Sequence, residues 1–217
     1  SISYYAFSGC NITSIDIPDS VTSIDSYAFQ NCTNLTSVTF GENCQLTDLG
    51  DCAFYKCISL ESIDIPASVT SISYYAFYGC TSLTSVGPIG SGASVEIPNG
   101  VTTIDSNAFY GCTSLTSVTI PNSVTSINHN VFWDCTNLES ITIPASVTSF
   151  GTNVFYYCSK LKTVYYEGTL EQWCKTSFSS APCNNGADLY INNVLATDIT
   201  IPSTITTINN SAFYGCT

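Results

Sequence analysis

Cysteine is the most chemically versatile residue of this chain: twelve cysteines occur among 217 residues, compared with a single histidine, His129. Thiols form disulfides, bind metals and act as nucleophiles. Eight of the twelve follow one short pattern: alanine or valine, then Phe, then two variable residues, then Cys. The eight are Cys10, Cys32, Cys57, Cys80, Cys112, Cys135, Cys158 and Cys216. Such regular use indicates one structural position that recurs along the chain.

The spacing of these cysteines defines a repeat of about 23 residues, because the steps between them are 22, 25, 23, 32, 23, 23 and 58 residues. In the unit that begins at Cys112, Val118 and Ile120 alternate with polar residues, which predicts a short strand that Pro121 ends. A second extended piece and a short 3₁₀ or helical turn complete the unit. Each unit therefore predicts one coil of a solenoid.

One coil cannot fold alone, because burying about six apolar side chains at roughly 1.5–3 kcal/mol each does not offset the ordering of about 23 residues at roughly 1–2 kcal/mol each. Stacked coils share a core and pair their strands in parallel. We therefore expect an α/β repeat solenoid of about eight coils over residues 1–217, with an inserted island at 165–198. The repeated phenylalanines should form a single row down its interior.

Stacking also determines what the repeated cysteines can do. Equivalent Cβ atoms in adjacent coils lie about 4.8 Å apart, beyond the roughly 3.5–4.5 Å typical of a disulfide. We expect a structural ladder of buried thiols that donate hydrogen bonds to backbone carbonyls. Without a CxxC pair or a second histidine, no metal site is expected. Cys174 and Cys183 are an open candidate for a disulfide, and Cys44 and Cys52 stay unassigned.

Charge excludes several classes of function. The chain has 4 Lys and Arg against 16 Asp and Glu, a net charge of −12, so neither nucleic acid nor anionic membrane is an expected partner. No apolar run is long enough to insert into a membrane. His129 occupies a variable repeat position, and the acids are spread along the chain, so we expect no catalytic residues, no cofactor and no enzyme activity.

Aromatic residues are the best candidates for binding. In six of eight units the residue after the repeated Phe is aromatic, which predicts a strip of rings along one edge: Tyr55, Tyr78, Tyr110, Trp133, Tyr156 and Tyr214. Such rings either shield the core by stacking on one another or recognise a protein or glycan, since Tyr and Trp are enriched at binding hot spots.

The 165–198 island offers a second candidate site. Its aromatic residues Tyr165, Tyr166, Trp173 and Tyr190 either bind a ligand or close a defect in the core. A short helix is expected near 169–175 and a hairpin turn at Asn192 and Asn193.

The repeated pattern LxxVxIPxSVTSIxxxAFxxC resembles the BspA-like, or Treponema-type, class of leucine-rich repeats. The resemblance implies a right-handed leucine-rich-repeat solenoid within an extracellular or cell-surface protein that adheres to a host or matrix protein or a glycan. The alternative is a scaffolding segment that associates with itself end to end or packs in a larger assembly.

Overall fold

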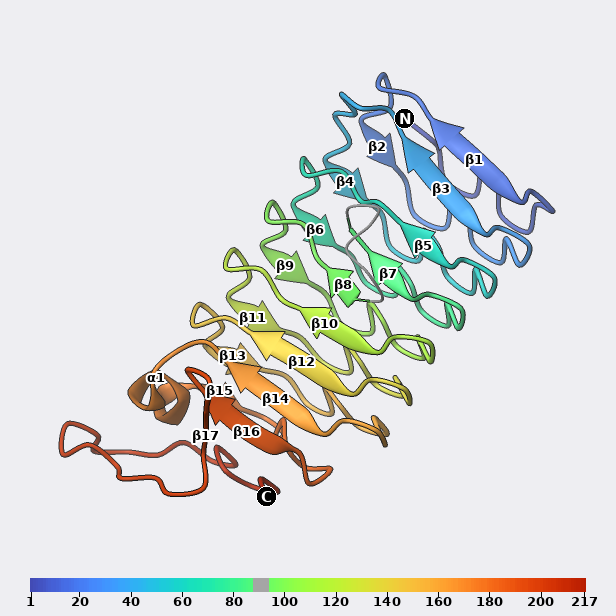
Figure 1. The fold of residues 1–217 in the computed structure, drawn as a ribbon. Helices are drawn as coiled ribbons and strands as arrows, with labels where there is room; N and C mark the ends of the chain where they lie inside the picture. Colours follow the sequence, from blue (N-terminus) through green and yellow to red (C-terminus); the bar gives the residue numbers. More distant parts are fainter. Residues whose placement is uncertain (88–93) are drawn as a thin grey trace.

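The computed structural model describes residues 1–87 and 94–217, which wind into a β-solenoid of about seven turns (Figure 1). Most turns contribute one strand to each of two rows. The first row holds two sheets: β1 (Ser14–Ile17), β3 (Ser37–Phe40), β5 (Ser62–Ile63) and β7 (Ser85–Val86), then β8 (Ser94–Glu96), β10 (Ser117–Thr119), β12 (Ser140–Ile143), β14 (Thr163–Tyr166), β16 (Asp188–Ile191) and β17 (Val194–Leu195). The second row holds β2 (Ser23–Ile24), β4 (Asp48–Leu49), β6 (Ser71–Ile72), β9 (Thr103–Ile104), β11 (Ser126–Ile127), β13 (Ser149–Phe150) and β15 (Ser177–Phe178).

The strands pair in parallel and in register, as the repeat predicts. Ser117 of β10 lies opposite Ser140 of β12, and the next residues, Val118 and Ile141, pair with their side chains buried. The register follows from the alternation, since a slip of one residue would move every apolar side chain to solvent. The antiparallel hairpin of β16 and β17 is confirmed, with Asn192 and Asn193 both at positive φ, as a tight hairpin turn requires.

The repeats contain turns where the sequence predicted short 3₁₀ or helical pieces, so the fold is a β-solenoid rather than an α/β repeat. Around Phe29, Tyr27 has a φ of 62° and Asn31 a φ of 57°, and a residue with positive φ ends a helical run. The N–H groups of all three bond instead to carbonyls of the next coil, at 2.8–2.9 Å. Within the described ranges, α1 (Leu170–Lys175) is the single helix. It lies where a short helix was expected, and Thr169 caps its N-terminus.

The core contains the predicted row for seven of the eight repeated phenylalanines, while Phe213, the eighth, is half-buried at the edge of the core. Seven rings stack with nearly parallel planes and centroid distances of 5.1–5.8 Å: Phe7, Phe29, Phe54, Phe77, Phe109, Phe132 and Phe155. The six rings after Phe7 are almost completely buried. Because each ring contacts the rings above and below it, this row fixes the spacing of the coils and of the side chains beside it.

Gly87 ends β7 at a point where no side chain fits. Its φ is 125°, and a Cβ added there would lie 2.2 Å from the carbonyl oxygen of Glu96 in β8. We expect Gly87→Ala to lower the free energy of unfolding by about 2–3 kcal/mol, because both backbone strain and the steric clash oppose it. Denaturant unfolding measures this loss, and Gly111→Ala is the control, since its φ is also positive but a Cβ there would meet atoms no closer than 3.7 Å. Equal losses for both variants would contradict the role given to the clash.

Candidate functional site

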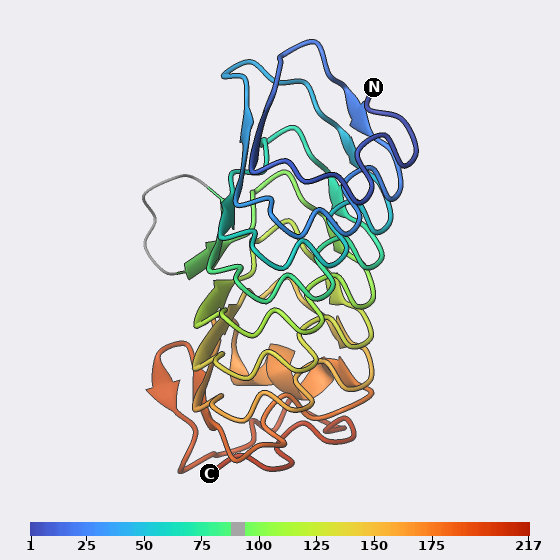
Figure 2. The ribbon, with the colours of Figure 1, turned by 90° about the vertical axis from the view of Figure 1, so that its right-hand side faces the viewer.

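The residues after the buried phenylalanines form a row of stacked rings along one edge of the solenoid, where Figure 2 shows the turns of successive coils. Because each Phe points inward, its neighbour points out. The centroid distances along the row are 4.8, 4.7, 5.7 and 4.7 Å for Tyr55, Tyr78, Tyr110, Trp133 and Tyr156. We call these five residues the aromatic row. The sixth strip residue, Tyr214, belongs to the last coil and is 70% exposed.

The aromatic row is both held in place and accessible. Its first four rings are half-buried by stacking, and Tyr156 is exposed. Additional tyrosines at the turns widen the surface, with Tyr75 edge-on to Tyr78 and Tyr157 edge-on to Trp133. Rings so arranged present π faces for stacking and hydroxyls for hydrogen bonds.

The hydroxyls of Tyr75 and Tyr110 stay protonated at neutral pH. A hydrogen bond with Tyr74, reinforced by burial, raises the pKa of Tyr75 to about 12. Burial beside Tyr78 raises the pKa of Tyr110 as well. These hydroxyls are therefore neutral groups that both donate and accept hydrogen bonds.

A hollow of about 400 Å³ interrupts this surface at Cys52. In neighbouring coils the residue two before the Phe is a tyrosine, Tyr27 or Tyr75, whereas here it is a buried cysteine. The shorter side chain leaves a gap between the tyrosines of the two adjacent coils. Sequence reasoning left Cys52 unassigned, although the break in a tyrosine column was the signal that marks it.

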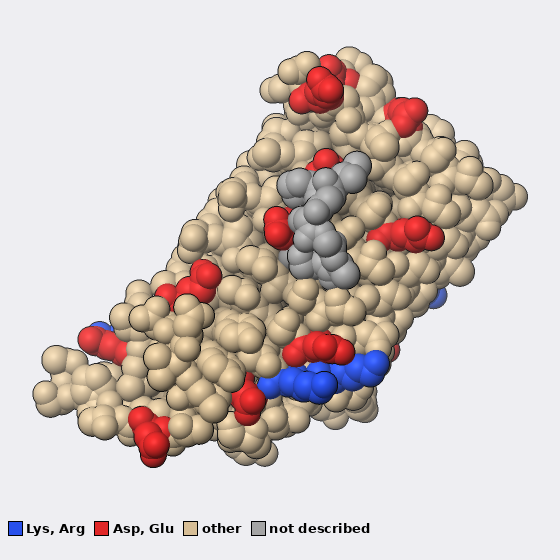
Figure 3. Space-filling view, viewed as in Figure 1, with Lys and Arg blue, Asp and Glu red and all other residues tan. Residues whose placement is uncertain are grey.

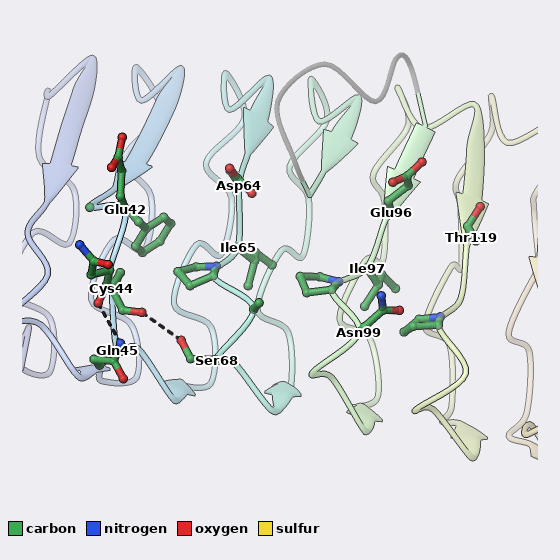
Figure 4. A pocket seen from close by; sticks show the side chains of 17 residues that line it. Glu42, Cys44, Gln45, Asp64, Ile65, Ser68, Glu96, Ile97, Asn99 and Thr119 are labelled. Atoms are coloured by element: carbon green, nitrogen blue, oxygen red, sulfur yellow. Dashed lines mark hydrogen bonds between the residues drawn. The ribbon is translucent and has the colours of Figure 1, made fainter.

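A larger groove, of about 790 Å³, lies where the strands of the first row end (Figure 4). Its lining combines apolar groups such as Ile65 and Ile97 with the carboxylates of Glu42, Asp64 and Glu96. Burial raises the pKa of Asp64. Sequence reasoning missed this groove, because its three carboxylates come from separate coils and line one surface only when the coils stack.

The surface carries few charges, and those it has are mostly acidic (Figure 3). Acidic side chains are scattered over the face drawn there, while most of the lysine visible lies in one patch near acidic residues. Within residues 1–87 and 94–217, no three His, Cys, Asp or Glu side chains gather as a metal site would need. In the same part of the chain no helix is long and apolar enough to cross a bilayer.

The repeated cysteines line the interior beside the phenylalanine row. Six thiols each donate to the carbonyl oxygen of the Phe in the preceding coil, at 2.9–3.2 Å: Cys32, Cys57, Cys80, Cys112, Cys135 and Cys158. All six side chains are buried, and the other two members of the ladder, Cys10 and Cys216, are half-buried. Burial raises the pKa of Cys112 and Cys135 well above its ordinary value, so these thiols are neutral and unreactive.

The structure divides the aromatic residues of the island. Tyr166 and Trp173 are buried in the core, and the Trp173 indole donates to the Ala212 carbonyl at 2.8 Å. Tyr165 and Tyr190 lie on neighbouring strands with their rings 5.1 Å apart, on the outer face of the first row. The island thus closes the core with one pair of aromatics and leaves the other pair accessible to a ligand. Its strands β15 and β16 also extend both rows of the solenoid.

Comparison with known proteins identifies the family of the repeat. A family model described as a BspA type leucine rich repeat region matches in six copies, over residues 1–91, 91–195 and 186–217. This chain belongs to the BspA-type leucine-rich-repeat family. No curated protein sequence matches it.

Solved structures of leucine-rich-repeat proteins share this solenoid fold. The leucine-rich-repeat protein of T. pallidum is 32% identical with a TM-score of 0.62, and the match covers 72% of this chain and 69% of that one. A leucine-rich-repeat protein of Bacteroides ovatus is 25% identical with a TM-score of 0.62, and there the match covers 88% of this chain and 56% of that one. The BspA-type match indicates a repeat region and no catalytic family.

Proposed function

We propose that this BspA-type segment is a non-enzymatic binding module, located outside the cell or on its surface, whose aromatic row contacts protein or glycan ligands. The observation that carries the proposal is a continuous row of five partly exposed rings, in which Tyr55, Tyr78, Tyr110 and Trp133 stack and Tyr156 lies tilted by 50° against Trp133. Membership of the BspA-type family supports a role in binding, and the surface location follows the same resemblance.

Stacking prepares the row for binding. Rings that already lie against one another lose little conformational freedom when a ligand covers them, which lowers the entropic cost of association. Trp133 occupies the most favourable position, because it contacts both Tyr110 and Tyr156 and carries the largest ring. We therefore expect Trp133 to contribute most to affinity.

The shape of the aromatic row favours an elongated ligand. The rings follow the axis of the solenoid, so a chain of sugar units or an extended peptide would contact several coils at once. Weak contacts repeated over several coils add up to avidity. The outer pair Tyr165 and Tyr190 supplies a second contact on the strand face.

The test is a binding screen against matrix proteins and an array of glycans, followed by affinity measurements on any ligand found. Trp133→Ala should raise the dissociation constant by about tenfold or more, the effect expected of a hot-spot aromatic. Tyr4→Ala is the matched control, since Tyr4 is also an exposed aromatic but lies in the first coil, outside the row.

The competing role is that of a scaffold whose copies associate with each other. Sedimentation of the chain at increasing concentration separates the two, because a scaffold should self-associate and a ligand-binding module should stay monomeric until ligand is added. An affinity unchanged in Trp133→Ala, with the fold intact by circular dichroism, would contradict the assignment of the row.

A further inference from the structure

The last coil lies directly against the turn at 183–186. The Thr217 hydroxyl donates to the Gly186 carbonyl at 3.0 Å. Gly215 is so close to Cys183 that an added Cβ would lie 2.5 Å from the Cys183 carbonyl oxygen. Cys216, between these two contacts, is thereby held beside Cys183.

The pattern of the thiol ladder breaks at this point. In the coil after Cys158, the side chain that donates to the preceding Phe carbonyl is not a thiol but the Asn185 amide, which bonds to the carbonyls of Phe155 at 3.0 Å and Cys158 at 3.1 Å. Asn185 thus takes over the hydrogen bond that a ladder cysteine makes elsewhere. The Cys183 thiol is released from that role.

Cys183 and Cys216 instead hydrogen-bond to each other through their side chains. Both are free thiols, Cys183 buried and Cys216 half-buried. The six ladder thiols with carbonyl acceptors point at backbone, whereas these two point at one another. The sequence left open a different pair, Cys174 with Cys183, and Cys174 is likewise a free, buried thiol.

We propose that Cys183 and Cys216 are a disulfide-forming pair that ties the last coil to the solenoid. The oxidant is a small-molecule disulfide such as oxidised glutathione. One protein thiolate attacks a sulfur of that disulfide and releases one glutathione thiol, which leaves a mixed disulfide on the protein. The second protein thiolate then attacks the protein sulfur and releases the second glutathione, so two thiols are oxidised and one disulfide is reduced.

Accessibility and proton affinity assign the order of attack. Cys216 is the more exposed of the two thiols. The hydrogen bond from Cys183 lowers the pKa of Cys216, whereas the same bond, followed by burial, raises the pKa of Cys183. Cys216 is therefore the first nucleophile and Cys183 the resolving thiol. The six ladder cysteines that donate to Phe carbonyls are excluded, because their thiols are buried and already hydrogen-bonded.

The bond would restrain the part of the chain with the least regular structure. After β17 ends at Leu195, residues 196–217 contain no strand or helix. A link at Cys216 fixes the far end of this segment to the turn at 183–186. The segment should then resist proteases that cut it in the reduced protein.

The sequence offers a direct assay. No lysine or arginine follows Lys175, so trypsin leaves Cys183 and Cys216 together in the peptide 176–217 and Cys174 in the peptide 163–175. The folded chain is incubated with oxidised glutathione, denatured, alkylated and digested. We expect ten of the twelve thiols to be alkylated. In the 176–217 peptide, both Cys183 and Cys216 should be unalkylated. A second digest that cuts before Asp188 and Asp198 should place Cys183 in the fragment 176–187 and Cys216 in the fragment 198–217. These two fragments should separate only after reduction.

Variants distinguish this pair from its alternatives. Cys216→Ser should leave all eleven remaining thiols open to alkylation, while Cys174→Ser, the control in the same island, should keep the internal link. Chymotrypsin should cut the 196–217 segment at least several-fold more slowly in the oxidised wild-type chain than in the reduced one. Twelve alkylated thiols after oxidation of the folded chain would overturn the proposal, as would a link between peptides 163–175 and 176–217.

Discussion

Replacing Phe109 with alanine is expected to lower the free energy of unfolding by about 3–5 kcal/mol, the range for truncating a buried aromatic. Phe109 is fully buried, and its ring stacks on Phe77 at 5.5 Å and on Phe132 at 5.6 Å. The coils around the cavity cannot close it, because their spacing is also held by strand hydrogen bonds. The loss therefore includes both the transfer of the ring and the cost of an empty space.

Guanidinium unfolding measures this effect, with circular dichroism reporting on the whole solenoid and fluorescence on the coils that hold Trp133 and Trp173. Tyr110→Ala is the matched control, since it removes an aromatic ring from the same coil at a half-buried position, and it should cost less than about 2 kcal/mol. Equal losses in the two variants would mean that the phenylalanine row does not hold the coils together.

Raising the pH above 9 is expected to unfold the protein through its buried thiols. Burial raises the pKa of Cys80 and Cys158 to about 12, and raises those of Cys57, Cys112 and Cys135 from the same reference value of 9.0. The unfolded chain therefore loses these protons at a lower pH than the folded chain does. Their contribution to stability is complete below pH 9 and is lost as the pH rises from about 9 towards 12.

The size of the effect follows from the number of thiols. Each contributes about 1.4 kcal/mol per pH unit in this window, so five thiols together lower the free energy of unfolding by roughly 7 kcal/mol per unit. This is comparable to the whole stability of a typical domain, about 5–15 kcal/mol, so cooperative unfolding is expected at about pH 10–11.

Unfolding at pH 7, 8, 9 and 10 tests this dependence. In Cys112→Ser the hydroxyl keeps a donor for the Phe77 carbonyl but does not ionise, so the slope above pH 9 should fall by about 1.4 kcal/mol per unit. Stability that stays flat between pH 8 and pH 10 would show that the thiols are hydrated and able to ionise in the folded chain.

The candidate binding surface was predictable only where the repeat is regular. The order of Tyr78, Tyr110 and Trp133 along one edge follows from their equivalent places in three successive units. The hollow at Cys52 and the groove beside Asp64 did not follow from that pattern. Both arise where one coil departs from its neighbours, and the shape of such a departure depends on the side chains of the coils on either side.

Local backbone geometry was the main point where expectation and structure differ. The stretch after each second strand has a length that suits a helical turn, but its N–H groups, such as those of Phe29 and Asn31, bond to the next coil. A helical turn satisfies its hydrogen bonds within the segment. In the solenoid, alternate N–H groups bond between segments, while those of Ala28 and Gln30 bond within the turn. The length of a segment cannot predict this division.

By itself, the sequence determined the period, the alternation of the strands, the inward phenylalanines and the family, because each of these depends on residues within one unit and recurs in the next. Only the tertiary structure decided which thiols meet, which island aromatics are buried and where side chains from separate coils gather. Those outcomes depend on contacts such as that between Cys183 and Cys216, which lie 33 residues apart and whose meeting the repeat does not predict. A periodic pattern contains no information about such contacts, since each occurs only once.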